Sequence, residues 1–264
     1  MKLPEGFNNA LNDALNIARG IEGYLSDREM RFLFLLGACP TTEGSVLEIG
    51  SFKGKSTVIL AKALKGEKIV AVDPLTSPSI TDPDLKGKAS AWDEFEKNIK
   101  NTGVENVVEF HQMFSHELAK DWQRNIRLLW IDGDHTYKGT KTDFDLFSGF
   151  LKDRAIIAFH DVLGFIGPLR VFLEDILLSD RFGSSGLVGT IGWAQYLKDK
   201  EQALRYKEEK LKLYLKLSRL MPIVSSDRAL NGLRRLKYKF LRSRIPHSGL
   251  SPEKWLSKVF GEVD

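Results

Sequence analysis

The chain has 264 residues, of which 42% are hydrophobic and 28% charged, so it is long enough for one large packed domain and an additional segment. It contains no run of about 18 apolar residues that could cross a membrane, and its first residues lack the apolar core of a signal peptide, so we expect a cytoplasmic protein. Its single cysteine, Cys39, excludes an internal disulfide and a cysteine metal cluster.

The net charge of +4 is distributed unevenly. Residues 198–244 hold fifteen Lys or Arg against five Asp or Glu, whereas residues 1–197 are mildly acidic. We therefore expect three parts: a helical lead-in (1–39), a main domain (40–197) and a basic helical extension (198–264). In the lead-in, Ser26 and Glu29 fit a capping box, and an apolar stretch from residue 30 to 36 ends at Gly37.

Residues 45–57 are the stretch on which the functional prediction depends. An apolar run, 45–49, stops at a glycine turn, and residues 56–64 can continue as a helix. Such a strand-turn-helix corner directs backbone N–H groups and a helix N-terminus at a ligand. An ordinary strand-to-helix turn without a ligand is the alternative.

Two kinds of ligand fit this corner poorly. A dinucleotide turn needs a second glycine where Phe52 stands, and a phosphate-binding P-loop needs four residues between Gly50 and Gly54, where this chain has three. The carboxylate of Glu48 would also repel a triphosphate, but it would attract a cation.

The pattern E-x-G-x-x-x-G-x-[ST] resembles motif I of the class I methyltransferases, which bind S-adenosylmethionine. In that family the glycines lie against the methionine part of the cofactor and the carboxylate lies near its amine end. The resemblance implies five cofactor-binding residues here: Glu48, Gly50, Ser51, Gly54 and Ser56.

A second predicted strand, 68–72, ends at Asp73, twenty-three residues after Gly50. An acid at this position can accept from both ribose hydroxyls of an adenosine. Residues 75–88 are polar and contain two prolines, which predicts a loop that could act as a lid over the corner. A helix (89–101) and a third strand (107–111) follow, and the family resemblance places Phe114 and Ser115 beside the adenine.

Ionisable side chains follow the next two predicted strands. Residues 128–131 lead to Asp132, Asp134 and His135, and residues 155–159 lead to His160 and Asp161, with a predicted helix, 140–151, between them. The carboxyl ends of parallel strands meet at one edge of a sheet, so these groups share the crevice of the cofactor. Carboxylates with imidazole suit a divalent ion; a hydrogen-bonded network that caps the strand ends is the alternative.

Together, V-L-E-I-G-S-F-x-G-x-S-T, V-D-P, I-D-G-D-H-T-Y-x-G and A-F-H-D-V resemble a bacterial class I methyltransferase group found with glycan biosynthesis, over about residues 40–200. The more distant likeness is to metal-dependent catechol and caffeoyl-coenzyme-A O-methyltransferases. It implies Asp132, His160 and Asp161 as ligands of Mg²⁺ or another divalent cation. His135 stands where those relatives place a catalytic lysine, and an imidazole can accept a proton at neutral pH.

The resemblance implies a Rossmann-like α/β fold, a seven-stranded, mostly parallel sheet with helices on both faces. A helix, 170–178, and glycine-rich strand pieces, 186–196, would complete it. Beyond residue 198, leucines among Lys and Arg predict one basic amphipathic helix before Pro222 and another after it. This extension is either a helical appendage or dimerisation arm, or a surface for anionic lipid or an acidic glycan carrier; nucleic acid is not expected.

The predicted function is S-adenosylmethionine-dependent O-methylation of a sugar, glycan or other small hydroxylated acceptor. In this prediction Asp132 and His135 are the catalytic residues, and the protein acts in the cytoplasm or at the inner face of the membrane. A non-catalytic, cofactor-binding scaffold of a glycan or lipid assembly complex is the alternative. ATP hydrolysis through a degenerate P-loop is a third hypothesis, which requires Lys55.

Overall fold

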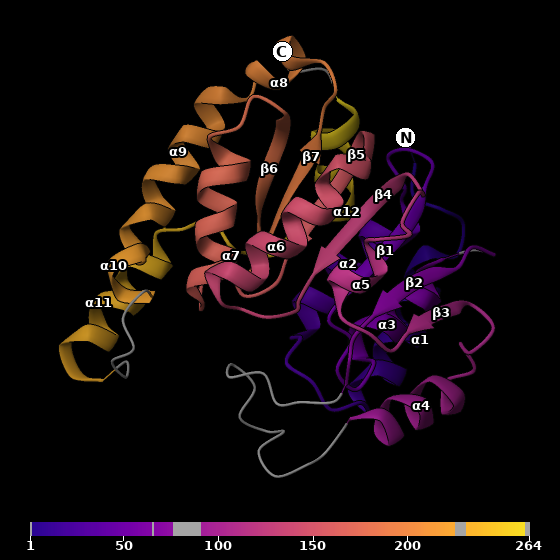
Figure 1. Ribbon diagram of the computed structural model, residues 1–264. Coiled ribbons are helices and arrows are strands. Elements are labelled where there is room, and N and C mark those ends of the chain that lie inside the picture. The colour runs from indigo at the N-terminus through magenta and orange to yellow at the C-terminus, as the bar shows by residue number, and fades with distance from the viewer. Residues whose placement is uncertain (1, 65, 76–90, 225–230, 262–264) are drawn as a thin grey trace.

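The computed structural model describes residues 2–64, 66–75, 91–224 and 231–261. A seven-stranded sheet with the order β3-β2-β1-β4-β5-β7-β6 lies at its centre (Figure 1). The first five strands run parallel, and β7 is antiparallel to both of its neighbours. This confirms the predicted mostly parallel sheet. The strands are β1 (Ser45–Ile49), β2 (Ile69–Val72), β3 (Val108–His111), β4 (Ile126–Ile131), β5 (Leu151–Phe159), β6 (Phe182–Val188) and β7 (Ile191–Tyr196).

Helices cover both faces of this sheet (Figure 1). One face packs against α1 (Phe7–Arg19), α2 (Asp27–Ala38), α3 (Lys55–Ala63), α4 (Trp92–Asn101) and α12 (Pro252–Phe260). The other packs against α6 (Tyr137–Phe147), α7 (Ile166–Val171), the π-helical η3 (Phe172–Leu177) and α9 (Lys207–Leu217). The shorter or peripheral helices are α5 (Ser115–Leu118), η2 (Ser148–Phe150), α8 (Lys200–Leu204), η4 (Ser218–Leu220), α10 (Met221–Val224) and α11 (Gly232–Ser243).

The central strands are apolar on both sides, which is why their sequences read as continuous hydrophobic runs. In β1, Val46 faces the layer of α1 to α3 and Leu47 the layer of α6 and α7. In β4, Trp130 faces the first of these layers and Leu129 faces the second. Because successive side chains point to opposite faces, one strand contributes to two cores.

The predicted capping box at the start of α2 is confirmed, since the Glu29 carboxylate accepts the Ser26 backbone N–H at 2.8 Å. Gly37, at which the predicted apolar stretch stops, lies inside this helix, which continues to Ala38. A Cβ at Gly37 would lie 2.8 Å from the Cβ of Ala63, so the glycine allows α2 to approach α3 closely.

Two other boundaries differ from the prediction. The helix predicted over 140–151 ends at Phe147, and Leu151 begins β5 by pairing with Ile126. The chain stays helical through Pro222 to Val224, after a 3-10 turn that precedes the proline. The predicted lid, 75–88, lies outside the described residues except for Leu75.

The C-terminal region packs on the sheet domain at several points. Leu213 and Leu217 of α9 join one core, and Trp255 of α12 is fully buried in the other, where its ring lies 6.3 Å from that of Trp193. Burying an aromatic side chain of this size contributes strongly to stability. Within the described ranges, no helix has both the length and the apolar content to cross a membrane.

Candidate functional site

The glycine turn after β1 is built around Gly50, whose φ is 89°. A Cβ at this position would lie 2.1 Å from the carbonyl oxygen of Asp132. Only glycine tolerates both the backbone conformation and this close approach. The turn after β1 and the end of β4, which carry two separate predicted motifs, therefore touch at the carboxyl edge of the sheet.

Asp73 holds the same turn from the neighbouring strand. Its carboxylate accepts the backbone N–H groups of Ser51 at 2.7 Å, Phe52 at 2.9 Å and Leu75 at 2.8 Å. Burial raises the pKa of Asp73, although the three hydrogen bonds act to lower it. The acid predicted to bind ribose thus also fixes the shape of the turn, in which Phe52 has a φ of 47°.

Glu48 lies fully buried beneath the turn. Its Oε2 accepts the hydroxyls of Thr57 at 2.5 Å and Ser51 at 3.2 Å, while Oε1 has no hydrogen-bond partner among the described residues. Burial raises the pKa of Glu48 to about 7, although the neighbouring hydroxyl groups oppose the rise. The carboxyl group therefore titrates near neutral pH and supports the turn from inside the domain.

The remaining predicted glycine, Gly54, caps the start of α3 with a φ of 87°. Lys55, which a P-loop would direct at phosphates, instead donates from Nζ to the carbonyl oxygen of Gly23 at 3.3 Å. The neighbouring Lys53 is buried and pairs with Glu22 at 2.6 Å. Both cations of the turn are thus engaged with the lead-in and do not converge on the corner.

At the ends of β4 and β5, three of the predicted residues converge. Oδ1 of Asp132 lies 3.1 Å from Nδ1 of His160 and 3.3 Å from Nε2 of His135. One donor atom from each residue lies within 4.8 Å of the others. Burial opposes ionisation of Asp132 and His160, but their mutual attraction outweighs it, so the Asp132 pKa is lowered and the His160 pKa is raised.

This triad has the donor atoms and spacing for a divalent ion. Metal bonds of about 2.1 Å place neighbouring ligand atoms about 3.0 to 3.4 Å apart, and both distances from Asp132 Oδ1 fall in that interval. The second ring nitrogens, Nδ1 of His135 and Nε2 of His160, are not among these ligand atoms, and they are buried without a partner in the described part of the chain. Two imidazoles and one carboxylate favour a transition metal or Zn²⁺ over Mg²⁺.

The other two acids of this edge lie differently. Asp161, the third predicted ligand, has a φ of 57° and places Oδ2 3.7 Å from Nδ1 of His160, outside the close triad. Asp134 bends back to accept the backbone N–H and the hydroxyl of Thr136, both at 2.9 Å, at the start of α6. In this structure His135 completes the close group around Asp132, and the ligand role of Asp161 stays a prediction.

The two residues predicted beside adenine follow β3. Phe114 is 52% exposed and stacks on His116, while Ser115 donates from Oγ to Oδ1 of Asp143 at 2.5 Å. Asp143 is buried on α6, and burial raises its pKa to about 7. It therefore links the segment after β3 to the helix that follows the triad.

Sequence reasoning missed two buried acids near the site. Asp143 gave a usable signal, because it is an acid on the apolar face of the predicted helix, beside Phe144 and Phe147. Glu29 gave none beyond its capping box. Its Oε1 accepts both the N–H and the hydroxyl of Thr190, 161 residues away, and so ties α2 to the turn between β6 and β7.

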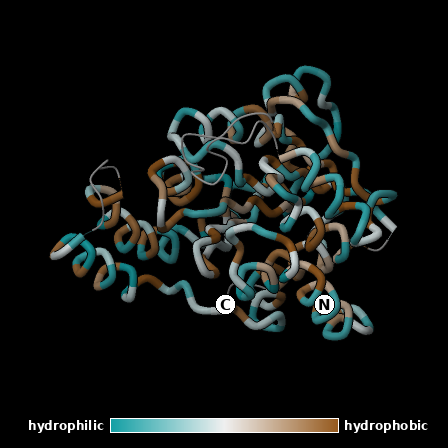
Figure 2. Tube along the Cα trace, turned by 90° about the horizontal axis from the view of Figure 1, so that it is seen from below, coloured by the Kyte–Doolittle hydropathy of each residue, from teal (hydrophilic) through white to brown (hydrophobic). Residues whose placement is uncertain are grey.

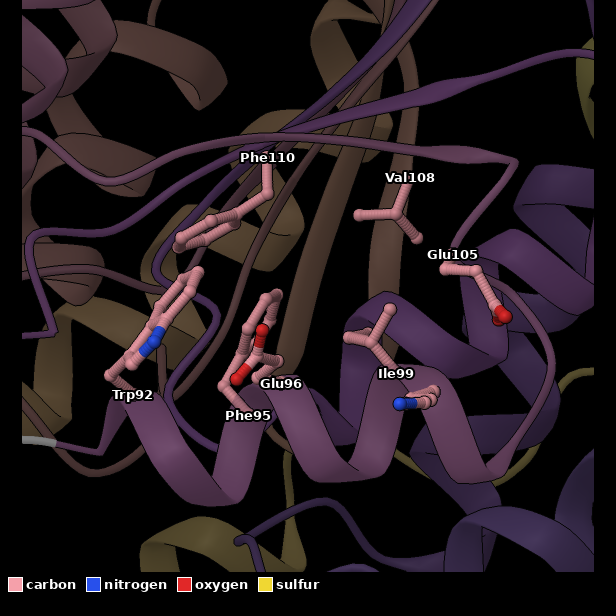
Figure 3. A pocket seen from close by; sticks show the side chains of 8 residues that line it. Trp92, Phe95, Glu96, Ile99, Glu105, Val108 and Phe110 are labelled. Carbon is pink, nitrogen blue, oxygen red and sulfur yellow. The ribbon is translucent and has the colours of Figure 1, made fainter.

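A separate cavity of about 280 Å³ lies between α4 and β3 (Figure 3). Its walls are mainly the side chains of Trp92, Phe95, Ile99 and Phe110, with charged groups at its margin. Strands β2 and β1 separate β3 from β4 and the triad. The cavity contains none of the predicted site residues.

Residues 47–162 match a family model described as a methyltransferase domain. Over these residues the chain is similar to a methyltransferase domain. The matched segment begins in β1 and ends just beyond Asp161, so the methyltransferase domain includes every candidate site residue. The predicted resemblance and enzyme class are thereby confirmed.

Protein R132 of Acanthamoeba polyphaga mimivirus, an uncharacterised protein, is 25% identical over 116 residues, 44% of this chain. The chain spans about half the length of this relative, 50%.

Solved structures show the same fold as this methyltransferase domain. An O-methyltransferase from Bacillus cereus in complex with SAH matches with a TM-score of 0.51 and 18% identity, over 71% of this chain and 90% of that one. The O-methyltransferase TomG from Streptomyces achromogenes, in complex with SAM, matches with a TM-score of 0.52 and 18% identity, over 75% of this chain and 92% of that one. These likenesses confirm the Rossmann-like methyltransferase fold.

Proposed function

We propose that this chain transfers the methyl group of S-adenosylmethionine to a hydroxyl oxygen of a small acceptor, with a sugar or glycan as the acceptor class. The contact between the Gly50 turn and Asp132 is the observation that carries the proposal. It brings a motif I corner and a buried carboxylate–imidazole triad to one edge of a methyltransferase domain. Acids and bases at such an edge are placed to act on a bound cofactor and its acceptor.

On this proposal, the turn binds the cofactor. Gly50, Ser51 and Gly54 lie against its methionine part, and Asp73 accepts from the ribose while it holds the turn. Ser56 and Glu48 support the corner from beneath, and Glu48 contributes negative charge near the ammonium and sulfonium groups. Phe114 and Ser115 lie beside the adenine, with Ser115 held by Asp143.

The acceptor hydroxyl must lose a proton as the methyl group arrives. We assign this proton to the imidazole of His135, because the Asp132 carboxylate, 3.3 Å from its Nε2, favours the protonated ring. The sulfonium is already an activated electrophile, so the protein mainly aligns the two reactants and supplies this base. The ring of Phe165, 4.6 Å from that of His135, lies where it can exclude water.

Two ligand sets for a divalent cation give His135 different roles. If Asp132, His160 and Asp161 hold the ion, His135 remains the base; if His135 completes the set, its metal-bound ring is not available as that base. A bound ion would supply charge that polarises the acceptor hydroxyl. Calorimetry with Zn²⁺, Mn²⁺ and Mg²⁺ on His135→Gln and Asp161→Asn separates the two, because only the residue that is a ligand weakens metal binding when it is changed.

The proposed function is tested by titrating S-adenosylmethionine, S-adenosylhomocysteine and ATP into the full chain, and then by assaying methyl transfer to hydroxylated sugars and to amines. We expect micromolar binding of the first two alone, and transfer to the hydroxylated acceptors. Absence of binding would overturn the proposal. Binding without transfer to any acceptor would favour the scaffold alternative. The cytoplasmic location stays a prediction.

A further inference from the structure

Helix α11 presents apolar side chains on two opposite faces. On its inner face, Tyr238 and Leu241 pack against the domain core, and the Tyr238 hydroxyl donates to the carbonyl oxygen of Leu163 at 2.8 Å. On its outer face, Leu233, Leu236 and Phe240 are 85%, 63% and 54% exposed. Their spacing of three and four residues aligns them along one side of the helix.

Cations flank this outer apolar row on both sides. No acidic residue occurs between positions 231 and 244. At about 100° per residue, Lys237 and Arg244 fall on one flank of the row, while Arg235 and Lys239 fall on the other, and all four are exposed. The guanidinium of Arg244 lies 4.0 Å from the centre of the Phe240 ring. We call these seven side chains the α11 outer face.

The α11 outer face lies at the periphery of the molecule. Figure 1 shows α9, α10 and α11 together at the left edge of the molecule. Figure 2 shows brown and teal segments close together in the helices at that edge, so apolar and charged residues are interleaved there. A planar partner can therefore reach α11 without meeting the body of the domain first.

We propose that the α11 outer face binds the surface of an anionic lipid bilayer. A helix with a bulky apolar row flanked by Lys and Arg lies in the interface with its apolar side chains among the acyl chains and its cations at the headgroups. Each such cation contributes about 1 kcal/mol near an anionic surface. A second copy of the same face would instead bring two sets of four cations together, and like charges oppose that contact.

This binding would place the methyltransferase site next to the membrane. Leu163, which anchors α11, follows Asp161 by two residues. Combined with the proposed function, on which this step rests, the geometry favours an acceptor hydroxyl at the membrane surface. Lipid binding itself does not depend on methyl transfer, so the two proposals can fail separately.

The test is co-sedimentation of the full chain with vesicles of phosphatidylcholine alone, or with about one third phosphatidylglycerol. We expect at least tenfold stronger partitioning, roughly the contribution of one to two cations, onto the vesicles that contain phosphatidylglycerol. High salt should weaken it, because exposed charges are screened. Equal binding to both lipids, or to neither, would overturn the proposal.

Two variants locate the binding surface. The triple change Leu233→Ser, Leu236→Ser and Phe240→Ser, and separately the pair Lys237→Glu and Lys239→Glu, should each lower partitioning about tenfold or more. Matched controls are Leu178→Ser, a 55% exposed leucine elsewhere, and the pair Lys97→Glu and Lys120→Glu, both exposed; these should partition as the original chain does.

Circular dichroism and binding of S-adenosylhomocysteine establish that each variant is folded. Unchanged partitioning of the triple variant would overturn the proposal. So would a stable dimer in light scattering that the triple variant converts to a monomer, since the apolar row would then be an interface between copies of the chain.

Discussion

The candidate site has two corners, the turn after β1 and the ends of β4 and β5, and the buried acids of each accept hydrogen bonds from different kinds of donor. After β1, the carboxylate of Asp73 takes three backbone N–H groups, and Glu48 takes two hydroxyls. At the ends of β4 and β5, Asp132 takes two imidazoles, each of which keeps a second, unpartnered nitrogen within the described structure. The first corner is therefore shaped mainly by its own chain, whereas the second leaves one nitrogen of each ring without a hydrogen-bond partner in the described structure.

This difference predicts separate effects of substitutions on cofactor binding and on methyl transfer. A corner held by its own backbone is preorganised, and changes there should alter cofactor affinity and stability together. Changes to a buried charge pair, such as Asp132 and His160, should lower turnover with little effect on cofactor binding.

The largest expected effect is that of Asp132→Asn. The change removes the charge that orients His135 and stabilises protonated His160, so we expect methyl transfer to fall by at least about 100-fold. The affinity for S-adenosylhomocysteine should stay within a few-fold, as calorimetry would show. Asp145→Asn on the exposed side of α6 is the matched control. Full activity in Asp132→Asn would remove the triad from the mechanism.

The next largest effect is expected for Asp73→Ala, which leaves the N–H groups of Ser51 and Phe52 without their acceptor. Each unsatisfied group costs about 1 to 3 kcal/mol. We expect the affinity for S-adenosylhomocysteine to fall about tenfold or more and the free energy of unfolding to fall by about 2 kcal/mol. Glu43→Ala, at a 97% exposed side chain, controls for loss of charge. Weakened binding with unchanged stability would show that Asp73 contacts the ligand without supporting the turn.

Glu48→Gln tests the pKa of about 7 that burial gives this carboxyl group. In the unfolded chain a glutamate releases its proton near pH 4.3, so between that pH and 7 the folded state holds a proton that the unfolded state has lost. Stability should therefore fall as pH rises through this window. The variant should lose this dependence, by up to about 1.4 kcal/mol for each pH unit.

Urea unfolding of the free protein between pH 4.5 and 7 measures this difference, with Glu43→Gln as the exposed control. Curves for Glu48→Gln that run parallel to those of the original chain would show that Glu48 is ionised throughout the window.

The smallest effect is expected for Lys55→Ala. Because the Lys55 ammonium is directed to the Gly23 carbonyl, its loss should change the affinity for S-adenosylhomocysteine by no more than about twofold, as for a surface substitution. Binding of ATP that disappears in this variant would revive the P-loop hypothesis and contradict the assignment of the corner to the methyl donor.

The sequence by itself determined the order of the elements and the place of the site. Apolar runs that end at Gly50, Asp73, Asp132 and His160 mark four strand ends, and parallel strands must bring those ends to one edge. For the same reason the sequence alone assigns the glycine corner and the ionisable residues to one crevice.

Only the tertiary structure decided which atoms meet. Whether Asp73 turns to backbone N–H groups, whether His135 or Asp161 joins the triad, and whether Glu29 reaches Thr190 all depend on segments far apart in the chain. Two helices in the last forty residues have similar amphipathic sequences but different environments. Helix α12 buries Trp255 in the core, while α11 leaves Leu233 in solvent. Periodicity specifies a face of a helix, but long-range packing decides what that face meets.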